Sequence, residues 1–106
     1  MSDARIAQLK AFLVEDPHDN FTLFALALEY IKMGDAGQAE KLFKSILAND
    51  PAYVGVYYHL GKLYESLGDI GMARSTYIEG IAVTRKAGEL HALSELETAL
   101  GECGDS

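Results

Sequence analysis

Few residues of this sequence are of the types that carry out chemistry, and their spacing does not bring them together. The histidines His18, His59 and His91 lie far apart and match no metal-binding spacing such as HExxH or paired cysteines. The single cysteine, Cys103, has no histidine at a fixed spacing and is a poor candidate for a nucleophile. We therefore predict no catalytic residue, no metal site and no cofactor, and expect that the protein is not an enzyme.

The composition is that of an ordinary globular chain with an acidic excess. Of the 106 residues 49% are hydrophobic and 24% are charged, with 16 acidic against 9 basic side chains and a formal net charge of -7. Binding to nucleic acid or to anionic membranes requires clustered lysine and arginine. We therefore expect neither nucleic acid nor a membrane as a partner.

The sequence also predicts a cytoplasmic location. Charged and polar residues interrupt the first segment, MSDARIAQLKAFLVED, so it has no apolar core of the kind a signal peptide needs. No segment approaches the roughly 20 apolar residues of a membrane span. A lone cysteine excludes an internal disulfide and suits a reducing compartment.

A repeat of 34 residues organises most of the chain. Asp16-Pro17 recurs as Asp50-Pro51, and the residues that follow each pair recur with the same period. The first set is Leu23, Leu26, Ala27, Tyr30, Gly34, Ala39 and Phe43, and the second is Tyr57, Leu60, Gly61, Tyr64, Gly68, Ala73 and Tyr77. A fixed period of this length indicates a supersecondary unit copied in tandem.

The apolar residues follow helical spacing throughout. We expect about five helices, arranged as one helix, two helical hairpins and a last helix, with short loops that make successive helices pack antiparallel. Gly34 suits the left-handed end of a helix over 21–33, and Asp35 with Gln38 predicts the cap of the next helix. In the second copy, helices are expected over 53–67 and 72–87, the latter ending near Gly88.

The two units resemble tetratricopeptide repeats, whose pattern is an aromatic residue, Leu-Gly/Ala, Tyr, a small turn residue, Ala, an aromatic residue and Pro. The second unit departs from the pattern at Gly80, where alanine is usual, and at Arg85, where proline is usual. The resemblance implies an all-α fold, a right-handed superhelical stack of antiparallel helix pairs. It implies one domain over 1–106, with a half-repeat helix at 1–16, repeats at 20–53 and 54–87, and a capping helix at 89–103.

The resemblance also implies a binding surface, because the first helix of each repeat in this family lines a concave groove that holds a peptide or partner helix. The groove positions implied here are Phe21, Phe24, Leu28, Ile31, Lys32, Tyr53, Tyr58, Lys62 and Glu65. Some members bind acidic C-terminal tails through a basic clamp. Phe24 and Leu28 stand where that clamp needs Lys and Asn, which leaves Lys32 and Lys62 as contacts for an acidic partner.

The helix over 21–33 is apolar nearly all round, so both of its sides must be covered. The second side is covered by the N-terminal helix, in which case Phe21 and Leu28 belong to the core, by another subunit, or by a ligand. We therefore expect a non-catalytic interaction module that binds a protein or peptide. The alternative is a self-associating module, a homodimer whose apolar groove is filled by its twin.

Overall fold

The structure, a computed structural model, describes residues 2–104. Within these residues the chain forms six α-helices and no strand. They are α1 Ser2–Glu15, α2 Asn20–Lys32, α3 Ala36–Asn49, α4 Val54–Ser66, α5 Ile70–Ala87 and α6 Leu90–Glu102. The expected number of about five was wrong, because each hairpin contributes two helices in addition to the two that flank the hairpins.

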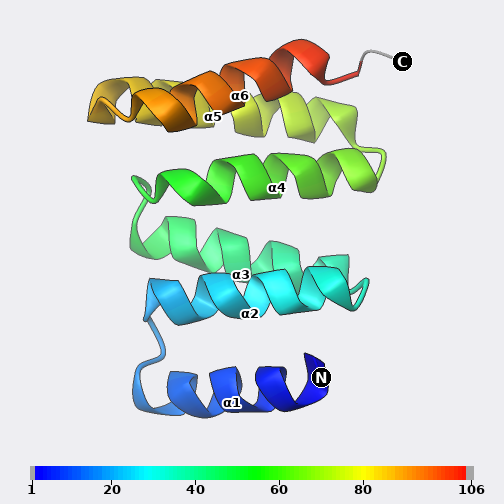
Figure 1. The fold of residues 1–106 in the computed structure, drawn as a ribbon, viewed down its shortest axis with the longest axis vertical. Helices are drawn as coiled ribbons and strands as arrows, with labels where there is room; N and C mark the ends of the chain where they lie inside the picture. The colour runs from blue at the N-terminus through cyan, green and yellow to red at the C-terminus, as the bar shows by residue number, and fades with distance from the viewer. Residues whose placement is uncertain (1, 105–106) are drawn as a thin grey trace. The chain divides into compact units, whose positions relative to one another are not determined.

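The chain divides into two compact units, a first unit over Met1–Asp50 and a second unit over Pro51–Ser106. In the first unit α1 packs on α2, and α2 packs antiparallel on α3 (Figure 1). In the second unit α4 packs on α5, and α6 packs on both α5 and α4. Each unit therefore holds one complete hairpin and one further helix.

Local sequence signals define the ends of the helices, as expected. Gly34 has a φ of 80° and Gly68 a φ of 79°, the left-handed geometry that follows the last turn of α2 and of α4. Directly after these glycines, Asp35 accepts a hydrogen bond from the backbone N–H of Gln38 at 3.2 Å, and Asp69 caps α5 in the same way at 3.1 Å. The predicted N-terminal cap of α3 at Asp35 is therefore confirmed.

In the second unit, two glycines allow α4 and α5 to pack closely. A Cβ atom on Gly61 would lie 2.2 Å from a ring carbon of Tyr77, and one on Gly80 would lie 2.5 Å from the Cβ of Tyr57. Gly80 therefore has a packing role where the family usually has alanine. Helix α5 is continuous from Ile70 to Ala87, through both Gly80 and Arg85, and ends at Gly88 with a φ of 74°.

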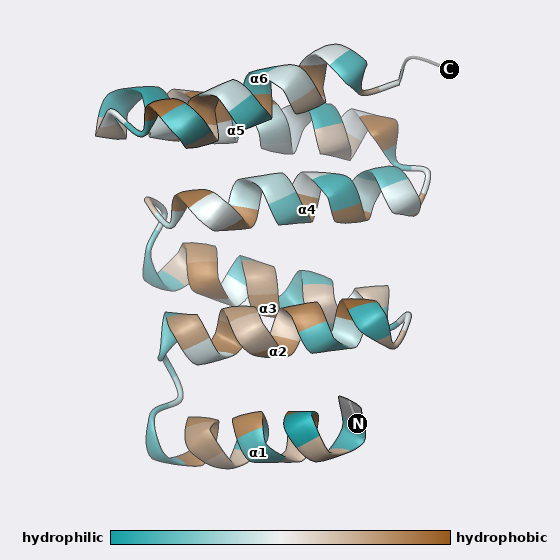
Figure 2. Cartoon of the chain, viewed as in Figure 1, coloured by the Kyte–Doolittle hydropathy of each residue, from teal (hydrophilic) through white to brown (hydrophobic). Residues whose placement is uncertain are grey.

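The flanking helices bury narrower faces than the hairpins do. In α1 the side chains of Ile6 and Leu9 are buried, whereas Phe12, whose spacing of three from Leu9 would put it on the same apolar stripe, is 68% exposed. In α6 Leu96 and Ala99 are the buried residues. Figure 2 shows how the helices differ in character: α2 is largely in brown tones, whereas α4 is largely teal and white.

Candidate partner-binding faces

The first candidate face lies on α2 and is apolar. Phe21 is 75% exposed, Ile31 is 36% exposed and Leu28 is half-buried. Phe24 is also half-buried, since its ring packs against that of Phe43 with the centroids 5.9 Å apart. Part of the face implied by the repeat pattern therefore also belongs to the core of the hairpin.

Helix α1 does not cover Phe21. The described contact of α1 with α2 includes Lys10, whose Nζ lies 5.8 Å from the centre of the Tyr30 ring. The alternative in which Phe21 packs on the N-terminal helix as part of the core does not hold, because three quarters of its surface remain accessible. Phe21 is therefore exposed to solvent on the outer face of α2.

The second candidate face lies on α4 and is polar. Tyr58 is half-buried, and the Nζ of Lys62 lies 5.6 Å from the centre of its ring. Glu65 lies 3.6 Å from Lys62 Nζ and also accepts a hydrogen bond from the hydroxyl of Tyr77. Tyr53 is half-buried at the position that precedes α4.

The period of 34 residues makes the contrast between these faces explicit. Phe24 corresponds to Tyr58, Leu28 to Lys62 and Ile31 to Glu65. The same structural positions are therefore apolar in the first unit and polar in the second.

Both lysines that were expected to contact an acidic partner already have a carboxylate beside them. The Nζ of Lys32 lies 3.1 Å from Glu29, one turn away on α2, and Lys62 is paired with Glu65. Each lysine is exposed, so these pairs are weak and can exchange. They nevertheless remove the local excess of positive charge that would attract an acidic tail.

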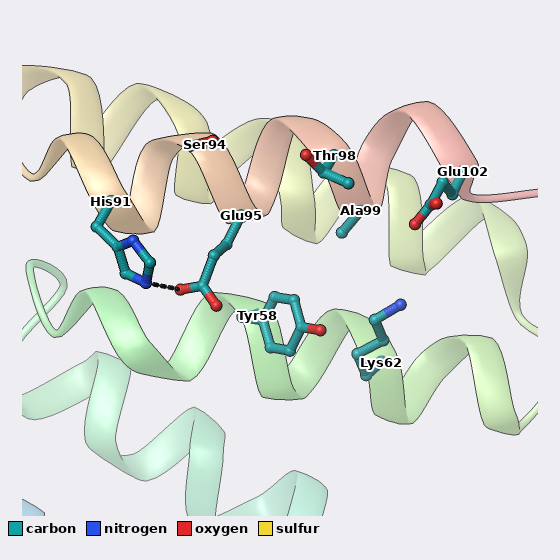
Figure 3. A pocket seen from close by; sticks show the side chains of 8 residues that line it. All are labelled: Tyr58, Lys62, His91, Ser94, Glu95, Thr98, Ala99 and Glu102. Carbon is teal, nitrogen blue, oxygen red and sulfur yellow. Dashed lines mark ion pairs between the residues drawn. The ribbon is translucent and has the colours of Figure 1, made fainter.

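A cleft of about 220 Å³ opens between α4 and α6 in the second unit. It is lined by Tyr58, Lys62, His91, Ser94, Glu95, Thr98, Ala99 and Glu102. Tyr58 and Lys62 point from α4 toward α6, and His91, Glu95 and Glu102 point from α6 toward α4 (Figure 3). The α6 side of this cleft was not predicted from the sequence, because the last helix was expected only to cap the second repeat.

His91 on α6 and His59 on α4 have different surroundings. His91 is exposed, and its Nε2 lies 3.6 Å from Glu95, with which it forms an ion pair when protonated (Figure 3). His59 is half-buried on α4, and the loss of water around it lowers its pKa below the ordinary value of 6.5, although Glu95 opposes this shift. Burial therefore favours the uncharged form of His59.

A buried tyrosine holds Glu65 in place. Tyr77 is fully buried on α5, and its hydroxyl donates to the Glu65 carboxylate. Burial, followed by this hydrogen bond, raises the pKa of Tyr77 well above its usual value of 10.0. Glu65 thus serves the packing of the hairpin as well as the polar face of α4.

Within the described residues, the side chains that could bind a metal or act as a nucleophile do not cluster. Within residues 2–104, no group of three or more histidine, cysteine, aspartate or glutamate side chains is arranged to hold a metal ion. Cys103 is buried beside α5, where Arg74 donates a hydrogen bond to its backbone carbonyl at 3.3 Å. Over the same residues, none of the helices combines the length and the apolar character that crossing a membrane requires.

Known proteins are similar to this chain in sequence or in architecture. A tetratricopeptide repeat domain protein from Salinibacter ruber, solved by NMR, is 48% identical, with 82% of this chain and 88% of that chain covered and a TM-score of 0.78. A TPR repeat-containing protein of Pseudomonas aeruginosa is 27% identical over 90% of both chains. The crystal structure of PcrH in complex with the chaperone binding region of PopD has the same fold, with a TM-score of 0.85, at 17% identity over 94% of this chain and 76% of that chain.

The match to a family is direct. The model of the tetratricopeptide repeat family matches residues 30–97, which include most of both hairpins and the first half of α6. The predicted all-α repeat fold is confirmed by this match and by the solved structures. The chain belongs to the tetratricopeptide repeat family, whose members are typically protein-interaction modules.

Proposed function

We propose that this chain is a non-catalytic module that binds a peptide or helix of a partner protein on the faces of α2 and α4. The observation that carries the proposal is the 75% exposure of Phe21 on an apolar face that α1 leaves open. An exposed aromatic ring beside other apolar side chains is the usual anchor of a protein interface.

The binding residues proposed on α2 are Phe21, Phe24, Leu28, Ile31 and Lys32. Those proposed on and before α4 are Tyr53, Tyr58, Lys62 and Glu65. The complex of PcrH with a region of PopD supports the proposal, since it shows that a protein of this fold takes a segment of another protein. A cytoplasmic location and the absence of a catalytic step belong to the same proposal.

Self-association is the second candidate. It is favoured by the large exposed apolar side chains of the first unit, Phe12 at 68% and Phe21 at 75%. A twin that covered these rings would remove them from water, which is worth about 25 cal/mol for each Å² of apolar surface. Size-exclusion chromatography with light scattering separates the candidates, because only self-association predicts a stable dimer.

Selection of short random peptides on the immobilised protein tests partner binding. We expect peptides enriched on the wild type to lose binding to Phe21→Asp and to Tyr58→Asp. The matched control is Ile78→Asp, which places the same charge at a position that is 55% exposed on α5, outside both faces. Circular dichroism must show unchanged helix content in all three variants.

The outcomes of this selection differ for the two candidates. Enrichment that depends on Phe21 and Tyr58 supports the proposal. Failure to enrich any peptide, together with a dimer that Phe21→Asp dissociates, would replace it with self-association.

A further inference from the structure

The cleft between α4 and α6 has walls of different chemistry. The α4 wall presents the ring of Tyr58 and the side chain of Lys62, and the α6 wall presents carboxylates on either side of Ala99 (Figure 3). A volume of about 220 Å³ is enough for one or two side chains of a partner, not for a whole helix. The cleft therefore selects particular side chains of whatever segment lies across it.

The charge of the cleft is negative at neutral pH. Lys62 is offset by Glu65, whose carboxylate lies 3.6 Å away. Within residues 2–104, neither Glu95 nor Glu102 forms an ion pair with a lysine or arginine. His91 lies beside Glu95 and neutralises that charge only when it is protonated, and the half-buried His59 on α4 also interacts electrostatically with Glu95. Two carboxylates are thus left without a permanent counter-charge.

The two carboxylates are spaced to act together. Glu95 and Glu102 are seven residues apart on α6, which puts them two turns apart on one face of the helix. Two turns of helix separate them by about 10 Å along its axis. Two basic side chains of one extended or helical segment can span this distance.

We propose that the cleft receives arginine or lysine side chains of the partner, so that the segment bound on α4 and α6 is basic. This inference rests on the proposed function and specifies the chemistry of the partner. The carboxylates of Glu95 and Glu102 accept charge-assisted hydrogen bonds from the basic groups. The Tyr58 ring contacts the aliphatic stem of the same side chain.

Charge complementarity selects this occupant over two others. A second copy of the chain would bring a net charge of -7 to an acidic cleft, and the two would repel each other. An acidic tail would meet Glu95 and Glu102 while having to displace Glu65 from Lys62. A basic segment is not repelled by the carboxylates and does not need to displace Glu65 from Lys62. The acidic excess of the whole chain also increases the rate at which a basic segment encounters it.

The experiment uses the full chain and the random-peptide selection described above. Enriched peptides are sequenced, and the most enriched one is synthesised with a fluorescent label for anisotropy titrations. We expect enriched sequences to carry a net positive charge. Replacing both carboxylates in Glu95→Gln/Glu102→Gln is expected to weaken binding of that peptide by about tenfold, as the loss of two exposed charge contacts implies.

The control removes the same number of charges elsewhere. Glu15→Gln/Glu79→Gln changes two exposed glutamates, on α1 and α5, that line no part of the cleft. We expect this control to weaken binding by less than about twofold, because distant exposed charges are screened by salt.

Three other results would contradict the inference. Enrichment of neutral or acidic peptides would overturn the inference that the partner is basic, while leaving the proposed interaction function intact. Equal losses of peptide binding in the two double variants would have the same consequence. The absence of any enriched peptide would overturn this inference and the proposed function together.

Discussion

The ring of Tyr77 lies against the backbone of Gly61, so close that a Cβ atom on Gly61 would be 2.2 Å from a ring carbon. Tyr77 cannot easily move away, because it is fully buried and its hydroxyl is bonded to Glu65. In the first unit the same positions hold Ala27 and Phe43, both fully buried. The second unit therefore combines the smaller residue on α4 with the larger ring on α5.

This relationship predicts that Gly61→Ala destabilises the protein. The added methyl group must displace the Tyr77 ring, and overpacking of this kind costs about 2 kcal/mol in the free energy of unfolding. Urea unfolding followed by circular dichroism measures the change. Gly71→Ala is the matched control, since its Cβ would meet only the Asp69 carboxylate at 3.9 Å. Equal stability of the two variants would contradict the packing account.

The hydrogen bond from Tyr77 to Glu65 gives a second prediction. Tyr77→Phe removes the hydroxyl and leaves the partly exposed Glu65 carboxylate to water, so we expect a loss of about 1 kcal/mol in the free energy of unfolding. Glu65→Gln in the Tyr77→Phe background should then cost less than Glu65→Gln alone. A double-mutant cycle measures this coupling, and strictly additive effects would show that the two side chains do not interact in solution.

The lowered pKa of His59 predicts a dependence of stability on pH. Its folded pKa lies below the ordinary value of 6.5, so between these values the unfolded chain binds a proton that the folded chain does not. The free energy of unfolding should therefore fall as the pH drops below about 6.5 and recover above it. Unfolding titrations at several pH values should show a smaller slope for His59→Gln than for the wild type, and an unchanged slope would contradict this prediction.

The buried face of α6 gives a fourth prediction. Leu96 is 1% exposed and packs against the position of Gly80, so Leu96→Ala should lower the free energy of unfolding by about 3 kcal/mol. Leu90, at the start of the same helix, is 73% exposed. Leu90→Ala should therefore change the free energy of unfolding by less than about 0.5 kcal/mol. Thermal unfolding of the two variants measures the difference. Similar values would mean that α6 is not packed on the hairpin as described.

Features set by local sequence could be predicted, because neighbouring residues determine them. Gly34 adopts the expected left-handed geometry, Gly68 adopts the same geometry 34 residues later, and Asp35 caps α3 as expected. The repeat period identified the hairpins and their family for the same reason, since it specifies which residues pack within each hairpin.

Features that depend on packing outside the repeat pattern could not be predicted in this way. The spacing of Phe12 matched the apolar stripe of α1, yet Phe12 is 68% exposed. The bond between Tyr77 and Glu65 joins two helices, and the period gave no sign of it. The carboxylates of Glu95 and Glu102 became part of a candidate site only once α6 was seen beside α4.

The most direct test of the central claim is to map the binding surface by NMR, with ¹⁵N-labelled protein and the most enriched peptide from the selection. We expect the chemical-shift changes to concentrate on the α2 and α4 faces, around Phe21, Phe24, Leu28, Tyr58 and Lys62. Changes confined to the exposed positions of α3 and α5, with these residues unaffected, would contradict it.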